Sequence, residues 1–170
     1  MKLHGLVQIG LGAVLLVGLF QQALAQTVDM SKIVLEVSVH SNDGQTDQHH
    51  YNLADLEELG LSNLTTQSPW SDAEQTFSGV LLRTLINAIG IRTGTLTATA
   101  LNDYAVTIPV ADFMKHDVLL ATQREGRYLS IRDRGPLWVI YPWSSEPSLQ
   151  NEMYYARSIW QLNRIEIRQN

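Results

Sequence analysis

Residues 131–143 constrain the fold of this chain more than any other stretch. Residues 137–141 are five consecutive apolar residues, preceded by the turn-forming pair Gly135 and Pro136 and followed by Pro142. A short apolar run between turn signals is typical of a strand that is buried on both faces. The loop before this strand carries three charged residues, Arg132, Asp133 and Arg134. Binding groups are often displayed where rigid strands end, so this loop is a candidate site, and a solvated charged hairpin is the alternative.

The first 25 residues have the features of a secretory signal peptide. Lys2 precedes an uncharged apolar run over residues 6–20, and the small residues at 23–25 match the signal peptidase site. The run is short for a membrane span of about 20 residues, so a cleaved signal is preferred to an anchor. We therefore expect one exported domain at residues 26–170, with no membrane span after cleavage. In a Gram-negative bacterium its location would be the periplasm.

The composition argues against several functions. The chain has 12 Lys and Arg against 17 Asp and Glu, a formal net charge of −5. We do not expect it to bind nucleic acid, because it lacks the excess of cations that replaces counterions on phosphate. It has no cysteine, which excludes thiolate catalysis and thiolate metal ligation. His49 and His50 are neighbours on a predicted strand and point to opposite faces, so no metal site is expected there.

Alternating apolar residues predict mainly strands. A first strand is predicted at 33–40 with a partner at 49–51, and a hairpin pairs 95–101 with 104–109 around Asn102 and Asp103. Further strands are predicted at 118–121, 128–131, 137–141 and 160–167, the last with a bulge near Asn163 and Arg164 because its apolar phase changes. Residues 64–70 are expected to be extended.

Helices are fewer. They are predicted at 53–59 with Asn52 as N-cap, at 82–89 ending before Gly90, and at 110–115. Together these elements predict an α+β fold with mixed, largely antiparallel sheets.

Several blocks resemble the molybdopterin-binding oxidoreductase domain family, the domain of sulfite oxidase. They are Phe77-Ser78-Gly79-Val80-x-Leu82 and its continuation to residue 85, residues 96–109, residues 131–142, residues 154–166 with Arg157-Ser158-x-Trp160-x-Leu162, and a weaker Leu53-x-x-Leu56. Each block alone is weak, but together they cover most of residues 26–170. The resemblance implies the layered mixed fold of the sulfite oxidase cofactor domain.

The resemblance also carries an expectation about the cofactor. Sulfite-oxidase-like enzymes hold molybdenum through the pterin dithiolene and one protein cysteine, whose place here would fall within residues 65–70. No cysteine lies there. Thr or Ser offers only a hard oxygen in place of a soft thiolate. We therefore expect a metal-free pterin as ligand and no metal, with molybdopterin as a second possibility and molybdenum catalysis disfavoured.

A pterin is a flat bicycle that an aromatic face, a carboxylate and an Arg would hold. The candidate contacts in or near the resembling blocks are Trp70, Asp103, Tyr104, Arg132, Asp133, Arg134, Trp138 and Arg157. Two of them have structural alternatives: Asp103 as a plain hairpin turn, and Trp138 as a core residue.

Small exported proteins similar to this one are pterin-binding regulators. They pass the ligand state to the periplasmic domain of a membrane receptor that makes or breaks cyclic di-GMP, so the resemblance implies such a partner. Two alternatives stay open: a molybdopterin-dependent oxidoreductase, and an exported interaction module without a ligand.

Overall fold

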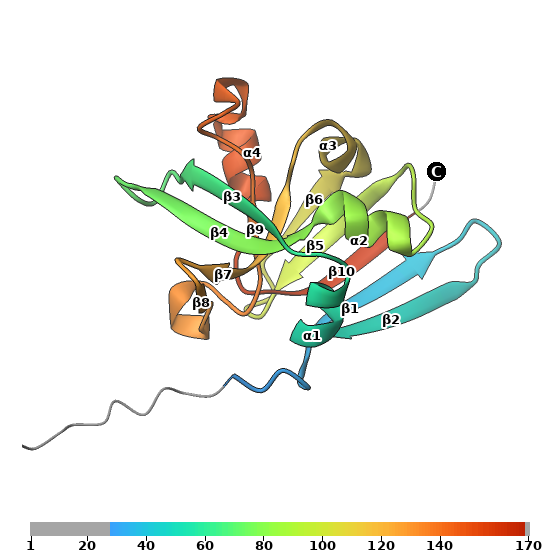
Figure 1. The fold of residues 1–170 in the computed structure, drawn as a ribbon. Coiled ribbons are helices and arrows are strands. Elements are labelled where there is room, and N and C mark those ends of the chain that lie inside the picture. The colour runs from blue at the N-terminus through green and yellow to red at the C-terminus, as the bar shows by residue number, and fades with distance from the viewer. Residues whose placement is uncertain (1–27, 169–170) are drawn as a thin grey trace, which may run out of the picture.

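The computed structural model describes residues 28–168, which form two sheets and four short α-helices (Figure 1). The first sheet has the order β2-β1-β10-β5-β6, with β1 Ile33–His40, β2 Thr46–Asn52, β10 Leu162–Arg168, β5 Thr95–Ala100 and β6 Ala105–Pro109. Only β1 and β10 are parallel; the other neighbours in this sheet are antiparallel.

The second sheet is antiparallel throughout. It has the order β3-β4-β7-β8, and β9 also pairs with β7. Its strands are β3 Ser62–Gln67, β4 Glu74–Leu81, β7 Leu119–Arg124, β8 Arg127–Tyr128 and β9 Trp138–Ile140. The helices are α1 Leu53–Glu58, α2 Leu82–Ala88, α3 Val110–Lys115 and α4 Glu152–Arg157, with 3-10 turns η1 Ile131–Asp133 and η2 Pro147–Leu149. The predicted α+β fold with largely antiparallel sheets is confirmed.

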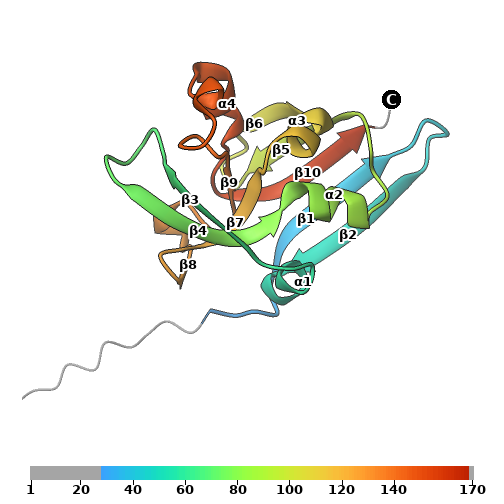
Figure 2. The same ribbon diagram turned by 45° about the horizontal axis from the view of Figure 1, so that its top comes forward.

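The core lies between the two sheets. Figures 1 and 2 show the second sheet crossing the first, with α2 following directly from the end of β4. β1 buries Leu35, Val37 and Val39, the alternate positions expected from the sequence, and α2 buries Leu82, Leu85 and Ile86. Burial of these side chains stabilises the fold by roughly 1.5–3 kcal/mol for each large aliphatic residue.

β9 links the two sheets. Residues 137–141 are all buried, as the sequence predicts. One edge of β9 pairs with β7. On the other edge Val139 N donates to Ile159 O at 2.9 Å, and Leu162 N at the start of β10 donates to Leu137 O at 3.0 Å. The strand is therefore a short connection between sheets rather than the centre of one.

Local sequence signals were largely correct. Asn52 caps α1 in a reciprocal capping box with Asp55, and Asp103 adopts a positive φ of 63° in the β5–β6 turn. The bulge in β10 lies between Leu162 and Arg164.

Three elements differ from the prediction. β4 and α4 were not predicted, and the strand expected at 128–131 ends at Tyr128, after which residues 129–130 lead into η1. The predicted signal peptide lies outside the described residues. Within residues 28–168, no helix has the length and hydrophobicity needed to cross a membrane.

Candidate ligand-binding groove

All four tryptophans of the chain meet in one cluster. Trp70 follows β3, Trp138 lies on β9, and Trp143 and Trp160 lie on the segments before η2 and β10. The ring centroid of Trp70 lies 5.8 Å from that of Trp138, 6.0 Å from Trp143 and 5.3 Å from Trp160. Residues far apart in sequence thus build one aromatic surface.

Arg134 lies against this cluster. Its guanidinium carbon is 5.4, 4.8 and 5.2 Å from the ring centroids of Trp70, Trp138 and Trp160. These are cation–π distances. Burial, and then the positive charge of Arg124, lower the pKa of Arg134 below its ordinary value. The backbone of Arg134 has a φ of 72°, and its carbonyl accepts a hydrogen bond from Gln161 N at 2.9 Å. Arg134 therefore packs the tryptophans together.

A groove of about 700 Å³ opens beside the tryptophan cluster. Its lining comprises Pro69, Trp70, Asn102, Tyr104, Glu152, Tyr155, Ala156, Ser158, Ile159 and Trp160. Tyr104 and Trp160 are 50% and 37% exposed, so their rings are accessible to a ligand. The groove combines aromatic walls with one carboxylate and one carboxamide. Its volume falls in the range of sites for small organic ligands.

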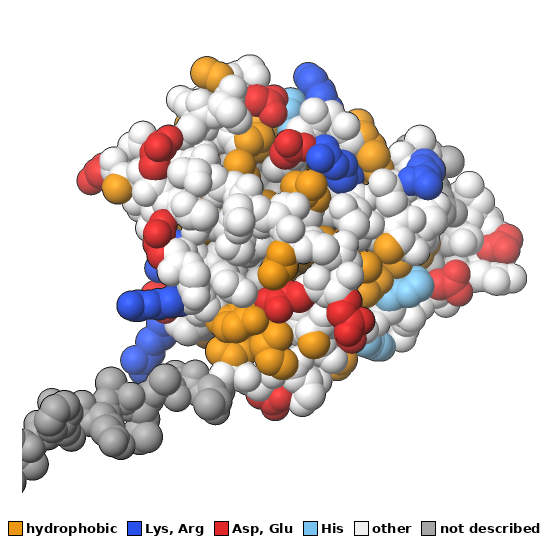
Figure 3. Space-filling model, in the orientation of Figure 1, with side chains coloured by type: hydrophobic (Ala, Val, Ile, Leu, Met, Phe, Trp, Pro, Cys, Tyr) orange, Lys and Arg blue, Asp and Glu red, His pale blue; other side chains and the backbone are white. Residues whose placement is uncertain are grey.

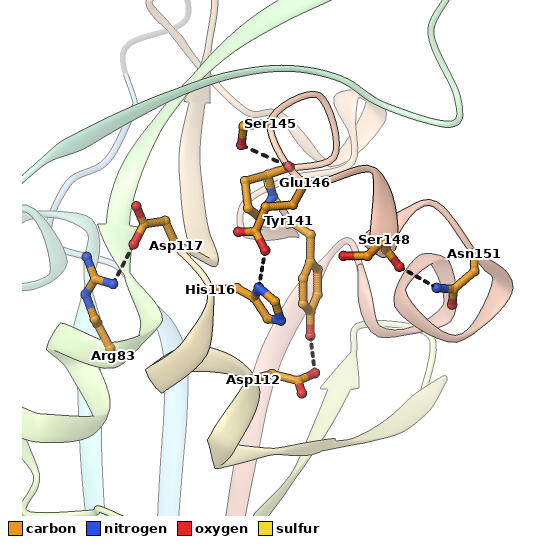
Figure 4. Close-up of polar contacts among 10 residues, drawn as sticks. Arg83, Asp112, His116, Asp117, Tyr141, Ser145, Glu146, Ser148 and Asn151 are labelled. Atoms are coloured by element: carbon orange, nitrogen blue, oxygen red, sulfur yellow. Dashed lines mark hydrogen bonds and ion pairs between the residues drawn. The ribbon is translucent and has the colours of Figure 1, made fainter.

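Helix α4, which supplies Glu152 and Tyr155 to the groove, is anchored by a buried ion pair. Arg157 Nη1 donates to Asp112 Oδ2 at 2.7 Å, and the Tyr141 hydroxyl donates to the same oxygen at 2.9 Å. Figure 4 shows Tyr141 pointing at Asp112. Burial and the negative charge of Asp112 raise the pKa of Tyr141, which stays protonated. This network fixes the end of α4 against α3.

A second polar contact holds the segment that precedes α4. His116 Nδ1, at the end of α3, lies 2.5 Å from Glu146 Oε2, next to η2 (Figure 4). His116 is only 3% exposed, and its ring packs edge-on against Tyr154 with centroids 6.0 Å apart. The Arg157–Asp112 pair and the His116–Glu146 contact both connect α3 to residues 146–157. Helix α3 therefore holds this wall of the groove at two points.

Residues 65–70, where the sulfite-oxidase-like cysteine would fall, offer hydroxyl groups. Thr66 is buried, and its Oγ1 accepts a hydrogen bond from Ser144 N at 2.9 Å. The buried Ser68 Oγ and Trp143 Nε1 have no hydrogen-bond partner within residues 28–168. Over the same range no three His, Cys, Asp or Glu side chains form a group that could hold a metal ion. The donors present here are hard and neutral, which does not suit molybdenum bound by a protein thiolate.

Four predicted contacts lie at or near the tryptophan cluster. Trp70 and Tyr104 line the groove. Trp138 is fully buried behind them and donates from Nε1 to Ser158 O at 3.1 Å, which corresponds to its core alternative. Arg134 joins the cluster through its cation–π contacts.

The other predicted contacts lie elsewhere or are already paired. Asp103 is exposed in the hairpin turn, 3.8 Å from Arg164. Arg132 is exposed on η1. Asp133 lies 3.5 Å from Arg124 and lines a different cleft. Arg157 is engaged by Asp112.

Sequence reasoning did not select Asn102, Glu152, Tyr155 or Trp160 as contacts. Trp160 was visible in the motif Arg157-Ser158-x-Trp160. Glu152 carried no signal, because α4 was not predicted and nothing local relates it to Tyr104.

Comparison with known proteins is consistent with the observed fold. The family model described as the oxidoreductase molybdopterin binding domain matches residues 45–169. No curated protein matches the chain. Because the match spans most of the sequence, this chain belongs to the oxidoreductase molybdopterin-binding domain family.

Proposed function

We propose that this protein is an exported, periplasmic, non-catalytic pterin sensor. Its ligand state would be passed to the periplasmic domain of a membrane receptor that makes or breaks cyclic di-GMP. Family membership supports a pterin as ligand. The regulatory role and the receptor rest on the resemblance to small cysteine-less exported regulators.

The composition of the groove is the observation that carries the pterin proposal. Tyr104, Tyr155 and Trp160 provide faces and edges on which a flat bicycle packs. The Glu152 carboxylate is an acceptor-only group with two oxygens, which suits the two donors on the amino-pyrimidine edge of a pterin. Asn102 adds a carboxamide that can both donate and accept.

The residues present fit the pterin and do not fit the metal. A molybdenum cofactor supplies oxygen-atom transfer when bound to a thiolate-bearing site. This chain has no cysteine, and the buried hydroxyl of Thr66 is hydrogen-bonded to Ser144. We therefore assign the residues of the groove to binding and orientation alone.

A signal would arise from linkage between ligand and conformation. The groove is built from four parts of the chain: Pro69 and Trp70 after β3, the β5–β6 turn with Asn102, helix α4, and the residues before β10 with Trp160. Contacts to all four would hold them in one arrangement. A receptor that binds this arrangement more tightly than others would report the presence of the ligand.

The test is a titration of the full chain with 6-hydroxymethylpterin, followed by pterin fluorescence. Glu152→Gln should weaken binding by about ten- to hundredfold, since a charge-assisted hydrogen bond contributes about 1.5–3 kcal/mol. Trp160→Ala should also weaken binding. The matched control is Glu58→Gln, which removes an exposed glutamate from the equally short helix α1 and should bind normally.

Equal affinity in wild type, Glu152→Gln and Trp160→Ala would refute the groove as the site. Metal analysis and pterin fluorescence of protein from its native host separate the alternatives. Pterin without molybdenum supports the sensor, whereas stoichiometric molybdenum restores the oxidoreductase. No bound pterin and no binding on titration would leave an interaction module.

A further inference from the structure

A second surface feature, a basic edge, lies next to Arg134. We define it by Arg124, Arg127, Ile131 and Arg132, on β7, β8 and η1. A cleft of about 440 Å³, lined by Arg124, Arg127, Tyr128 and Asp133 among others, runs along it. In Figure 3, Lys and Arg side chains project at the left, where Figure 1 places β8. The chain as a whole has a net charge of −5, so this edge opposes the overall charge.

The acidic groups of the edge are already occupied. Asp133 pairs with Arg124 at 3.5 Å and accepts from Ser130 Oγ at 2.7 Å. Glu125 accepts from Thr76 N at 2.6 Å. The two arginines at positions 127 and 132 are exposed, and the structure shows no ion pair for them within residues 28–168. The edge carries three arginines against two carboxylates, Asp133 and Glu125, so its net charge is +1, opposite in sign to that of the whole chain.

An apolar side chain stands among these arginines. Ile131 is 60% exposed, more than any other exposed large hydrophobic residue in the described part of the chain. Ile131 lies on η1, next to Arg132 and near the cleft lined by arginines. On contact with a partner protein it can bury apolar area while the arginines pair with carboxylates of the partner. Such an apolar anchor with a charged rim is typical of a protein contact.

One residue, Gln161, connects the groove to the basic edge. Gln161 accepts from Leu101 N at 2.9 Å, and its backbone N donates to Arg134 O at 2.9 Å. Its Nε2 donates to Ile131 O at 2.8 Å. Trp160, which precedes Gln161 in the sequence, and Asn102, which follows Leu101, both line the groove. Fixing the groove therefore fixes Gln161, and Gln161 positions η1.

We propose that the basic edge is the docking surface for an acidic segment of a partner protein that carries an apolar anchor, and that the ligand in the groove controls this docking through Gln161. The control step rests on the proposed function; the docking surface does not. The arginines favour a partner segment with acidic side chains, and the exposed Ile131 favours one with an apolar side chain that packs against it.

The test measures binding of a fluorescein-labelled peptide, Asp-Glu-Leu-Asp-Glu-Leu-Asp-Glu, to the full chain by anisotropy. The variant Arg127→Glu with Arg132→Glu should lose at least tenfold in affinity. The matched control reverses two exposed arginines elsewhere, Arg92→Glu with Arg168→Glu, and changes the net charge equally. It should lose less than twofold. Raising salt should weaken wild-type binding, because exposed charges are screened.

Equal losses in the two double variants would overturn the docking surface, because net charge alone would then explain binding. Binding to vesicles of anionic phosphatidylglycerol in place of the peptide would overturn it too. Ligand control is tested with Gln161→Asn, since Asn tolerates the positive φ of 53° and its shorter side chain loses the bond to Ile131. The variant should bind pterin and peptide but no longer couple them.

The outcomes separate this inference from the proposed function. If the pterin binds and the peptide does not, the docking surface is wrong and the sensor proposal is untouched. If the peptide binds through the arginines while no pterin binds, the surface is supported and both ligand control and the sensor proposal fail.

Discussion

The variant Arg157→Met tests whether α4 is anchored by its buried ion pair. Methionine keeps an unbranched apolar stem of similar reach and removes the charge. Arg157 and Asp112 are 16% and 12% exposed and lie 2.7 Å apart, so both groups are largely desolvated. After the change, Asp112 keeps the Tyr141 hydroxyl as a partner and loses its only countercharge among the described contacts.

The expected loss of stability follows from burial. Removing one partner of a buried pair costs about 3–5 kcal/mol, because the other charge stays buried without compensation. The hydrogen bond from Tyr141 places the expectation at the lower end, about 3 kcal/mol. Loss of the contact between the guanidinium and the Tyr154 ring, 5.5 Å from its centroid, adds to this.

Urea denaturation of the full chain measures the free energy of unfolding. The matched control is Arg83→Met, which removes a pair with Asp117 whose side chains are 39% and 62% exposed. An exposed pair contributes about 0–1 kcal/mol, so this variant should be nearly as stable as wild type. Equal losses for Arg157→Met and Arg83→Met would refute the anchoring role. So would a failure of Asp112→Asn, added to Arg157→Met, to recover any of the lost stability, because that change removes the uncompensated buried charge.

Three further changes follow from other features. Because burial raises the pKa of Tyr141, its contribution to stability is present below pH about 10 and is lost as pH rises above it; Tyr141→Phe should flatten the alkaline stability profile followed by circular dichroism. Gly135→Ala should destabilise strongly or prevent folding, because a Cβ at this position would lie 2.1 Å from Leu129 O; thermal unfolding measures this. Asn52→Ala should cost about 1 kcal/mol in urea, since it breaks the capping box with Asp55.

Local chemistry was readable from the sequence. Asn52 before an apolar periodic run predicted the start of α1, and Asn102 with Asp103 predicted a hairpin turn. The change of apolar phase after Leu162 predicted the bulge in β10. Each of these features depends on neighbours within a few residues, which is the range over which sequence patterns are informative.

The missed elements have physical explanations. β4 passes into α2 without a loop, since Leu81 is both its last residue and the N-cap of the helix, so no turn signal separates the strand from the predicted helix at 82–89. A register shift at Ser78 and Gly79 also breaks its alternation. Helix α4 has six residues and no fully buried one, which leaves no apolar period to detect.

The arrangement of the site could not be predicted from local sequence patterns. Trp70, Trp138 and Trp160 are brought together by the pairing of β7, β9 and the segment before β10, at sequence separations of more than 20 residues. Arg134 was predicted as a ligand contact on a charged loop. Its side chain packs on the three rings, a contact with distant residues that the sequence of the loop does not indicate.

The position of β10 in the first sheet bears on the order in which the protein folds. This strand, formed by residues 162–168, is inserted between β1 and β5, so β1 and β2 have no connection to the rest of their sheet until it is in place. During synthesis, which begins at the amino end, β1 and β2 are made long before the strand that joins them to β5. Long-range pairing of this kind is slow to form. The topology thus delays closure of the core until nearly all of residues 28–168 have been made.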